Sequence, residues 1–216
     1  MKHLLLFIAV LGLSCKQKKK YHDVEKQNEI VQQDTLVNSV LHWQGKLNKE
    51  YANPETSPLP DRYRKDFESL DFFKPDVNYI VIADLERTPE AIPFMMPTTT
   101  GRKSKEVVYG ILTFVLQGEK HQLEVYQNRK LMLEEGYRDY LFLPFTDESN
   151  GEETYAGGRY IDLRIPEGNK MQIDFNKAYN PYCVYNKKYS CPIVPSVNNL
   201  NVKVLAGVKS FQSDNK

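Results

Sequence analysis

The chain has 216 residues and a formal charge of only +1, because 29 basic side chains nearly balance 28 acidic ones. This length is enough for one well-formed hydrophobic core and marginal for two. The balanced charge, together with a sequence that contains no recognisable nucleic-acid-binding motif, excludes a protein that binds nucleic acid through a basic surface.

The N-terminal segment resembles the signal of a bacterial lipoprotein. Lys2 precedes an apolar run over residues 4–13, which is too short to cross a bilayer as a stable helix but suits a secretory signal. The run ends in Leu-Gly-Leu-Ser-Cys. The resemblance implies a signal peptide over residues 1–14 and an acyl chain on Cys15, which would attach the protein to a lipid bilayer. The alternative is an ordinary signal peptide followed by an incidental cysteine.

Residues 15–34 are polar and rich in lysine and glutamine, and they predict a lipidated tether with some helical character. Lysines at positions 16 and 18–20 would lie beside the anchor, where they suit an anionic lipid surface or simply a solvated tether. Because this segment is basic rather than acidic, we expect an exported, membrane-anchored protein of the cell envelope that faces the periplasm.

Two helices are predicted before the β-rich part of the chain. Apolar residues recur near helical spacing over residues 35–51, and prolines at positions 54, 58 and 60 follow. Residues 35–59 are therefore expected to form a helix and a proline-rich linker. A short helix over residues 61–70 comes next, with Asp61 as its expected N-cap.

Beyond residue 75 the sequence consists of short apolar or alternating segments of the kind found in β proteins. Strands are predicted over residues 78–84, 107–116, 121–127, 140–145, 159–165, 170–175 and 202–208. Many short strands separated by turn residues are typical of one antiparallel domain. The predicted fold is mainly β (β-rich α+β): a single antiparallel β-barrel or sandwich domain over residues 60–211, preceded by one or two N-terminal helices.

The strands at 159–165 and 170–175 are predicted to pair as a hairpin. Apolar side chains of an antiparallel pair must point to the same face. A three-residue loop over residues 166–168 satisfies this rule, because it pairs Leu163 with Met171 and Ile161 with Ile173.

This register places Arg159 on the apolar face of the sheet, beside Phe175. A buried cation needs an acidic partner. Asp147, Glu152 and Glu153 are the natural candidates, since all three precede Arg159 in one acidic, glycine-rich segment.

Cys183 and Cys191 are the two cysteines that remain if Cys15 carries lipid. An exported protein meets an oxidising compartment, so a disulfide between them is the first expectation. Free or redox-active thiols are the alternative. A metal site is least favoured, because zinc needs further ligands and no histidine lies near either cysteine in the sequence. We expect neither a metal nor a cofactor.

Polar and aromatic residues around the two cysteines admit two interpretations. Tyr179 and the tyrosines at 182, 185 and 189 could cover the end of the sheet or line a ligand pocket. Asp174, Asn176 and Asn180 could cap turns through side-chain bonds to the backbone, or present polar groups to a ligand.

Several motifs together resemble a family of uncharacterised bacterial proteins known as domain of unknown function 1684 (DUF1684). They are FTDESNGEETYAGGRYIDL, DFNKAYNPYC, YSCPIVPSVNNLNV and AGVK, and the resemblance covers about residues 60–211. It implies domain limits but no activity. With the hairpin register, it nominates a candidate binding or catalytic set in which the first two motifs meet: Asp147, Tyr155, Arg159, Asp174, Asn176, Tyr179 and Asn180.

Three functional hypotheses follow from these patterns. The first is an envelope lipoprotein whose β-rich module binds a small molecule, a glycan or an envelope protein. The second is a hydrolase that uses Asp147 and Asp174 as acid and base near Arg159. The third is a thiol or disulfide protein acting through Cys183 and Cys191. The first is favoured over an enzyme because the sequence holds no recognisable catalytic signature.

Overall fold

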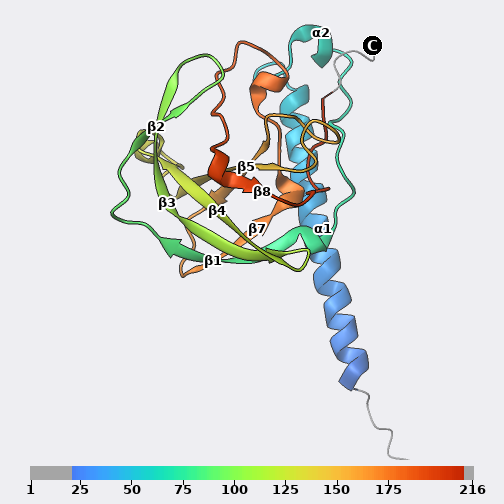
Figure 1. Ribbon diagram of the computed structural model, residues 1–216. Coiled ribbons are helices and arrows are strands. Elements are labelled where there is room, and N and C mark those ends of the chain that lie inside the picture. The colour runs from blue at the N-terminus through green and yellow to red at the C-terminus, as the bar shows by residue number, and fades with distance from the viewer. Residues whose placement is uncertain (1–20, 212–216) are drawn as a thin grey trace, which may run out of the picture.

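The computed structural model describes residues 21–211, and side chains within residues 31–211. Helix α1 (Tyr21–Ala52) and the short helix α2 (Asp61–Arg64) precede a curled β-sheet. The strands are β1 (Ile80–Arg87), β2 (Phe94–Pro97), β3 (Lys103–Leu116), β4 (Glu119–Asn128), β5 (Tyr140–Asp147), β6 (Arg159–Arg164), β7 (Lys170–Asp174) and β8 (Asn199–Leu200). Figure 1 shows α1 along one side of the sheet, with its first turns extending away from the body.

The sheet is mainly antiparallel and curls into a half-barrel. Its strand order is β6-β5-β4-β3-β1-β7, with β2 added to β3 and the short β8 added in parallel to β5. Within the described residues, β6 and β7 form no ladder with each other, so the curl stays open between them. The predicted fold class is confirmed: a β-rich domain follows N-terminal helices.

The hydrophobic core lies inside the curl of the sheet. In β1 the alternate residues Val81, Ala83 and Leu85 are buried. Leu112, Phe114 and Leu116 of β3 belong to the same cluster. The long β3 shifts register between Val108 and Gly110. A side chain at Gly110 would place its Cβ 2.5 Å from the carbonyl oxygen of Glu86, so only glycine fits this close approach of β3 to β1.

The predicted hairpin between residues 159–165 and 170–175 is wrong. β6 instead pairs with β5, where Leu163 faces Leu141, and β7 pairs with β1, where Ile173 faces Val81. The predicted faces are nevertheless right, because Ile161, Leu163, Met171 and Ile173 are all buried. Alternation fixes the face to which a side chain points, but two strands with equally apolar faces can each find another partner.

The strand predicted at residues 202–208 is also wrong. β8 ends at Leu200, and the chain then runs without regular structure although Val204, Ala206 and Val208 are buried. The main-chain carbonyls of these same residues accept hydrogen bonds from Arg159, which takes the place of a neighbouring strand.

The helices differ from expectation in their limits. α1 begins at Tyr21, well before residue 35, whereas α2 ends at Arg64 rather than at residue 70. Asp61 is not the N-cap of α2; Pro60 holds that position, and Asp61 pairs with Arg64 at 2.8 Å. Neither helix within residues 21–211 combines the length and apolar character that a membrane crossing requires. The expected signal peptide and Cys15 lie outside the described residues.

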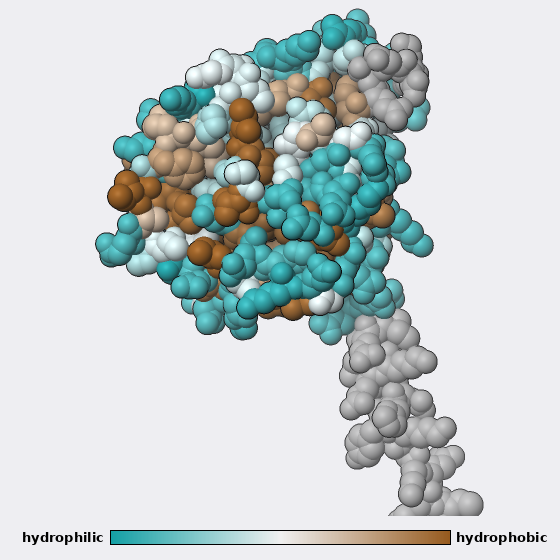
Figure 2. Space-filling view, in the orientation of Figure 1, coloured by the Kyte–Doolittle hydropathy of each residue, from teal (hydrophilic) through white to brown (hydrophobic). Residues whose placement is uncertain are grey.

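The face of the body seen in Figure 2 mixes hydrophobic and hydrophilic residues. The described chain exposes several large apolar side chains, among them Ile82, Ile92 and Val115. Scattered surface hydrophobes of this kind are common in globular proteins, so they mark no interaction surface by themselves.

Candidate functional site

Arg159 and Asp147 form a fully buried ion pair. Arg159 Nη2 lies 3.0 Å from Asp147 Oδ2, and neither side chain has any exposed surface. Asp147 Oδ1 also accepts hydrogen bonds from the amides of Ser149 and Val204, at 2.9 and 3.0 Å. Of the three acidic partners considered for Arg159, Asp147 is therefore the one that contacts it. Burial lowers the pKa of Arg159, and the charge of Asp147 opposes that shift.

The second predicted motif has bonds within the protein as well. Asp174 accepts hydrogen bonds from the backbone and side-chain nitrogens of Asn176, at 3.1 and 3.0 Å, and pairs with Lys177 at 3.3 Å. Asn176 in turn exchanges two 2.9 Å hydrogen bonds with the backbone of Asp76. Asn180 donates to the carbonyl of Lys209 at 2.9 Å. The hydrogen bonds of these side chains link loops that are distant in the sequence.

The two predicted motifs meet through the backbone of Tyr160 and Tyr179. Each amide donates to the carbonyl of the other residue, at 2.9 and 3.0 Å, and the two rings make an edge contact. Tyr155 is half-buried, and burial raises its pKa. Of the seven nominated residues, Tyr179 alone lines the cavity described next.

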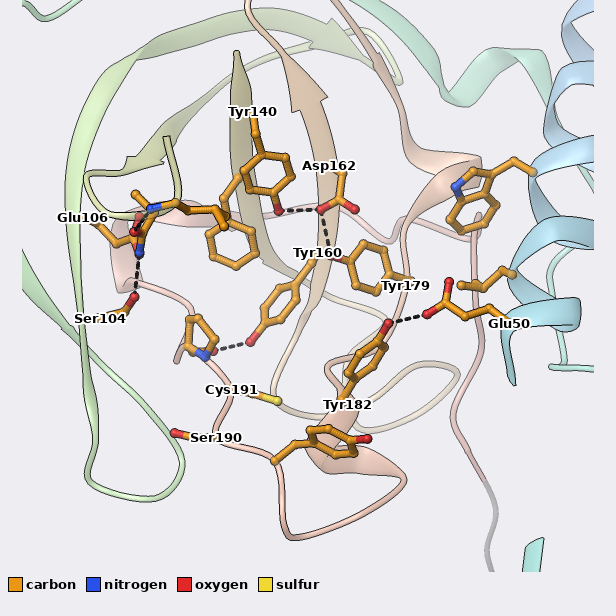
Figure 3. A pocket seen from close by; sticks show the side chains of 17 residues that line it. Glu50, Ser104, Glu106, Tyr140, Tyr160, Asp162, Tyr179, Tyr182, Ser190 and Cys191 are labelled. Carbon is orange, nitrogen blue, oxygen red and sulfur yellow. Dashed lines mark hydrogen bonds between the residues drawn. The ribbon is translucent and has the colours of Figure 1, made fainter. Parts of the chain in front are cut away.

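A cavity of about 450 Å³ lies between α1 and the sheet. Residues from α1, β3, β5, β6 and the segment 179–192 line it (Figure 3). Its aromatic wall consists of Trp43, Tyr140, Phe142, Tyr160, Tyr179, Tyr182 and Tyr189. The rings support one another, as in the contacts of Phe142 with Tyr160 at 4.7 Å and of Tyr182 with Tyr189 at 5.3 Å. We call this cavity the aromatic pocket.

Carboxylates hold the tyrosines of the aromatic pocket. Asp162 Oδ1 accepts hydrogen bonds from the hydroxyls of Tyr140 and Tyr179, at 2.7 and 2.8 Å, and Glu50 of α1 accepts one from Tyr182 at 2.6 Å. Figure 3 shows Glu50 on one side of the pocket, Glu106 on the other and Asp162 between them. Burial raises the pKa of all three tyrosines, so their hydroxyls stay protonated and continue to donate.

Glu106 is the most deeply buried carboxylate of the pocket, with 3% of its surface exposed. Its Oε1 accepts hydrogen bonds from Ser104 and Asn128, at 2.7 and 2.6 Å. Its Oε2 is buried and has no hydrogen-bond partner. Burial raises the pKa of Glu106, and the hydrogen bonds from Ser104 and Asn128 and the charge of Arg102 offset only part of that shift.

A comparison with known families identifies the domain. The family described as "Protein of unknown function (DUF1684)" matches residues 65–209. The chain belongs to the DUF1684 family. The aromatic pocket draws most of its wall from the family region, whereas Trp43, Leu47 and Glu50 of α1 precede it.

This DUF1684 chain is also similar to a protein of known structure. The solution structure of the uncharacterized protein from gene locus rrnAC0354 of Haloarcula marismortui is 28% identical, with a TM-score of 0.61. The match covers 87% of this chain and 96% of the other. No curated protein matches this sequence. The similarity therefore supports the DUF1684 fold and brings no activity with it.

The two DUF1684 cysteines lie next to each other without a bond between their sulfur atoms. The amide of Cys183 donates to Sγ of Cys191 at 3.1 Å, and both residues are free thiols in the structure. Cys191 also lines the aromatic pocket. Burial raises the pKa of its thiol to about 12, which makes it a poor nucleophile near neutral pH. The disulfide stays a prediction.

Sequence reasoning missed Glu106 and Asp162, the two carboxylates of the pocket that come from the sheet. Asp162 does lie on the polar face predicted for the strand at 159–165, together with Tyr160. Glu106 precedes a strongly apolar strand segment, where a glutamate ordinarily marks an exposed strand end. Its burial depends on Asn128 of β4, and no local signal in the sequence reports that contact.

Proposed function

We propose that this DUF1684 protein is an exported lipoprotein whose β-rich domain binds a small molecule in the aromatic pocket. The pocket itself carries the proposal. Its volume falls within the range of roughly 300–1,000 Å³ found for small-molecule sites, and an apolar wall with a few polar groups is the usual composition of such sites.

The environment of the predicted acid–base pair favours binding over hydrolysis. Asp147 is enclosed with Arg159, and Asp174 holds Asn176 and Lys177. Neither carboxylate lines the aromatic pocket. A general acid or base must reach the proton that it transfers, and the oxygens of these two groups are already bonded within the protein.

The proposed location rests on the N-terminal signal pattern. An acyl chain on Cys15, followed by a basic tether, would hold the domain at the membrane on the periplasmic side. In that oxidising compartment Cys183 and Cys191 would form a disulfide, and the backbone already brings them together. This pair would then act as a staple in the wall of the pocket rather than as a redox centre.

Trp43 provides a direct test of ligand binding. It is the single tryptophan of the chain, and it lines the aromatic pocket. We expect the full protein, purified from its own membrane in detergent, to show a saturable change of tryptophan fluorescence with at least one member of a chemically diverse small-molecule library. Mass spectrometry of the same preparation should find the acyl mass on Cys15.

A matched pair of variants decides whether the signal comes from the pocket. Asp162→Asn removes the negative charge of the side chain that accepts hydrogen bonds from Tyr140 and Tyr179. Asp84→Asn removes an exposed carboxylate on β1. We expect the first variant to change the affinity and the second to leave it unaltered. The proposal would be overturned if no library member produced a saturable change, or if both variants altered the response equally.

A further inference from the structure

The aromatic pocket has an acidic wall. Glu50, Glu106 and Asp162 line it, and no lysine, arginine or histidine is among its described lining residues. Cations do contact the wall from outside the lining. Arg102 bonds to Ser190 through Nε and Nη2, each at 3.1 Å, and Lys188 Nζ lies 5.0 Å from the ring centre of Tyr189. An anionic ligand would therefore meet like charges, and a cationic ligand would meet opposite ones.

Most of the tyrosine hydroxyls of the wall already donate their hydrogen atoms to acceptors within the protein. The hydroxyls of Tyr140 and Tyr179 donate to Asp162, that of Tyr182 donates to Glu50, and that of Tyr160 donates to the carbonyl of Pro192. A tyrosine hydroxyl has one hydrogen and two lone pairs. After these bonds, each hydroxyl can offer a ligand an acceptor and no donor.

The remaining polar side chains of the wall show the same pattern. Asn128 gives its amide hydrogens to Ser104 and Glu106, and Ser104 gives its hydrogen to Glu106. Ser190 donates to Thr98 at 2.9 Å. Only Trp43, Tyr189 and Cys191 of the described wall keep a hydrogen that no protein acceptor takes. The pocket is thus rich in acceptors and poor in donors.

Glu106 identifies where a donor is needed most. Its Oε2 is enclosed by the wall and lacks a partner, although a buried carboxylate oxygen without a hydrogen bond is costly. Because this oxygen is buried, the side chains around it must shift before a ligand N–H can reach it, and that contact would then supply the missing bond. If that N–H also carried a positive charge, it would add a counter-charge inside the pocket, whereas Arg102 acts on Glu106 from outside the lining.

The aromatic rings favour the same ligand. The faces of tyrosine and tryptophan attract cations electrostatically, and several such rings around one cavity form a favourable site for an organic ammonium group. They also accept the apolar part of the molecule that carries the charge.

We infer that the aromatic pocket selects organic cations that carry N–H donors, such as primary alkylammonium or guanidinium compounds. The inference rests on the proposed function and names the ligand class of that same pocket. A carbohydrate fits less well, because its hydroxyls donate and accept in equal measure and most of this wall only accepts. A phosphate or carboxylate ligand would be repelled by the acidic side chains of Glu50, Glu106 and Asp162.

Four small probes of similar shape separate the contributions of the positive charge and of the N–H donors to binding. Benzylammonium has the ring, the charge and N–H donors; benzyltrimethylammonium has the ring and the charge without N–H donors. Benzyl alcohol is neutral, and benzoate is anionic. With Trp43 fluorescence of the full-length protein as the readout, we expect benzylammonium to bind about tenfold or more tightly than each of the others.

Glu106→Gln tests the residue that carries the argument, and Glu86→Gln is its matched control. The first substitution removes the buried charge with little change of shape, and the second removes an exposed charge on β1. We expect the affinity ratio of benzylammonium to benzyl alcohol to fall about tenfold in Glu106→Gln and to stay at the wild-type value in Glu86→Gln. The comparison of probes on the wild-type protein needs no variant, so it stands if Glu106→Gln folds poorly.

The outcomes distinguish this inference from the proposed function. If benzyl alcohol or benzoate binds as tightly as benzylammonium, the selection of cations is overturned while small-molecule binding stands. Equal binding of benzyltrimethylammonium and benzylammonium would overturn the need for N–H donors. If none of the four probes binds, the cation inference fails. Binding of some other library compound would then retain the proposed function, and a library without any binder would remove both.

Discussion

Arg159 shows how a single buried charge can organise part of this domain. Its guanidinium is enclosed completely, and it is neutralised by Asp147 and bonded to main-chain carbonyls of residues 204–208. Its charged end is also 5.4 Å from the ring centre of Phe145 in the core. The cation is therefore held by groups from β5 and from the C-terminal segment at once.

Asp147→Asn should destabilise the protein by about 3–5 kcal/mol, because it leaves the buried cation without its counter-charge. The free energy of unfolding in urea measures this loss. Glu152→Gln is the control: Glu152 pairs with Lys203 but is 69% exposed, so its replacement should leave the free energy of unfolding close to the wild-type value. The double variant Asp147→Asn with Arg159→Met should regain part of the lost stability. A loss below about 1 kcal/mol for Asp147→Asn would show that the ion pair is not the support described here.

Glu106 should make the stability of the protein depend on pH. Its folded-state pKa is raised above the ordinary value of 4.5, so the folded protein holds this proton more tightly than the unfolded chain does. Stability linked to Glu106 is then fully present below the ordinary carboxyl pKa and falls as the pH rises through the raised value.

Glu106→Gln removes this dependence. We expect the variant to melt at a higher temperature than the wild-type protein near pH 8, and the difference to disappear toward about pH 4, where both folded and unfolded Glu106 are protonated. Thermal unfolding across this pH range measures the effect. Glu86→Gln should follow the wild-type curve. A melting-temperature difference that stays constant with pH would contradict the assignment.

At the scale of elements, the sequence predicts the faces of strands better than their neighbours. Ile161 and Met171 both point into the core as predicted, yet they lie on strands at opposite ends of the sheet order. Their alternation is a local property, whereas the choice of β5 and β1 as partners depends on the whole sheet. Residues 202–208 show the same limit of local patterns. Their apolar composition predicts a strand, but the carbonyls of Val204 and Ala206 accept hydrogen bonds from Arg159 instead of from a neighbouring strand.

If the protein is exported as proposed, the loop between Cys183 and Cys191 should be closed by a disulfide. On chain-entropy grounds so short a loop contributes roughly 2.5 kcal/mol. We therefore expect reductant to lower the melting temperature by about 5–10 °C. The double variant Cys183→Ser with Cys191→Ser should have the melting temperature of the reduced protein, whether or not reductant is present.

Mass spectrometry of the unreduced protein gives an independent check on this loop. Two thiols that react with an alkylating agent in the unfolded protein without prior reduction would contradict the disulfide. The raised pKa of Cys191 predicts that, in the reduced folded protein, this thiol reacts slowly near neutral pH.

At the scale of the whole molecule, the fold class could be predicted, whereas of the pocket the sequence suggests only Tyr179, Tyr182 and Tyr189 as possible lining. Periodicity and turn residues were enough to predict a single β-rich domain after N-terminal helices. The aromatic pocket combines Glu50 of α1 with Glu106 of β3, Asp162 of β6 and Tyr182, which are far apart in the chain. Only the curl of the sheet against α1 brings them together, and no local pattern encodes that arrangement.

The dependence of Arg159 on residues 204–208 has a consequence for how the chain is made. Residues 204–208 are synthesised 45 to 49 residues after Arg159, and until they are available the cation at position 159 has no complete set of acceptors. Tyr51 of α1 likewise joins a cluster with Val208. We therefore expect the nascent domain to stay incompletely folded until residues 204–208 have been synthesised. If the chain is exported as proposed, such a late closing step would keep it competent for translocation until residues 204–208 have crossed the membrane.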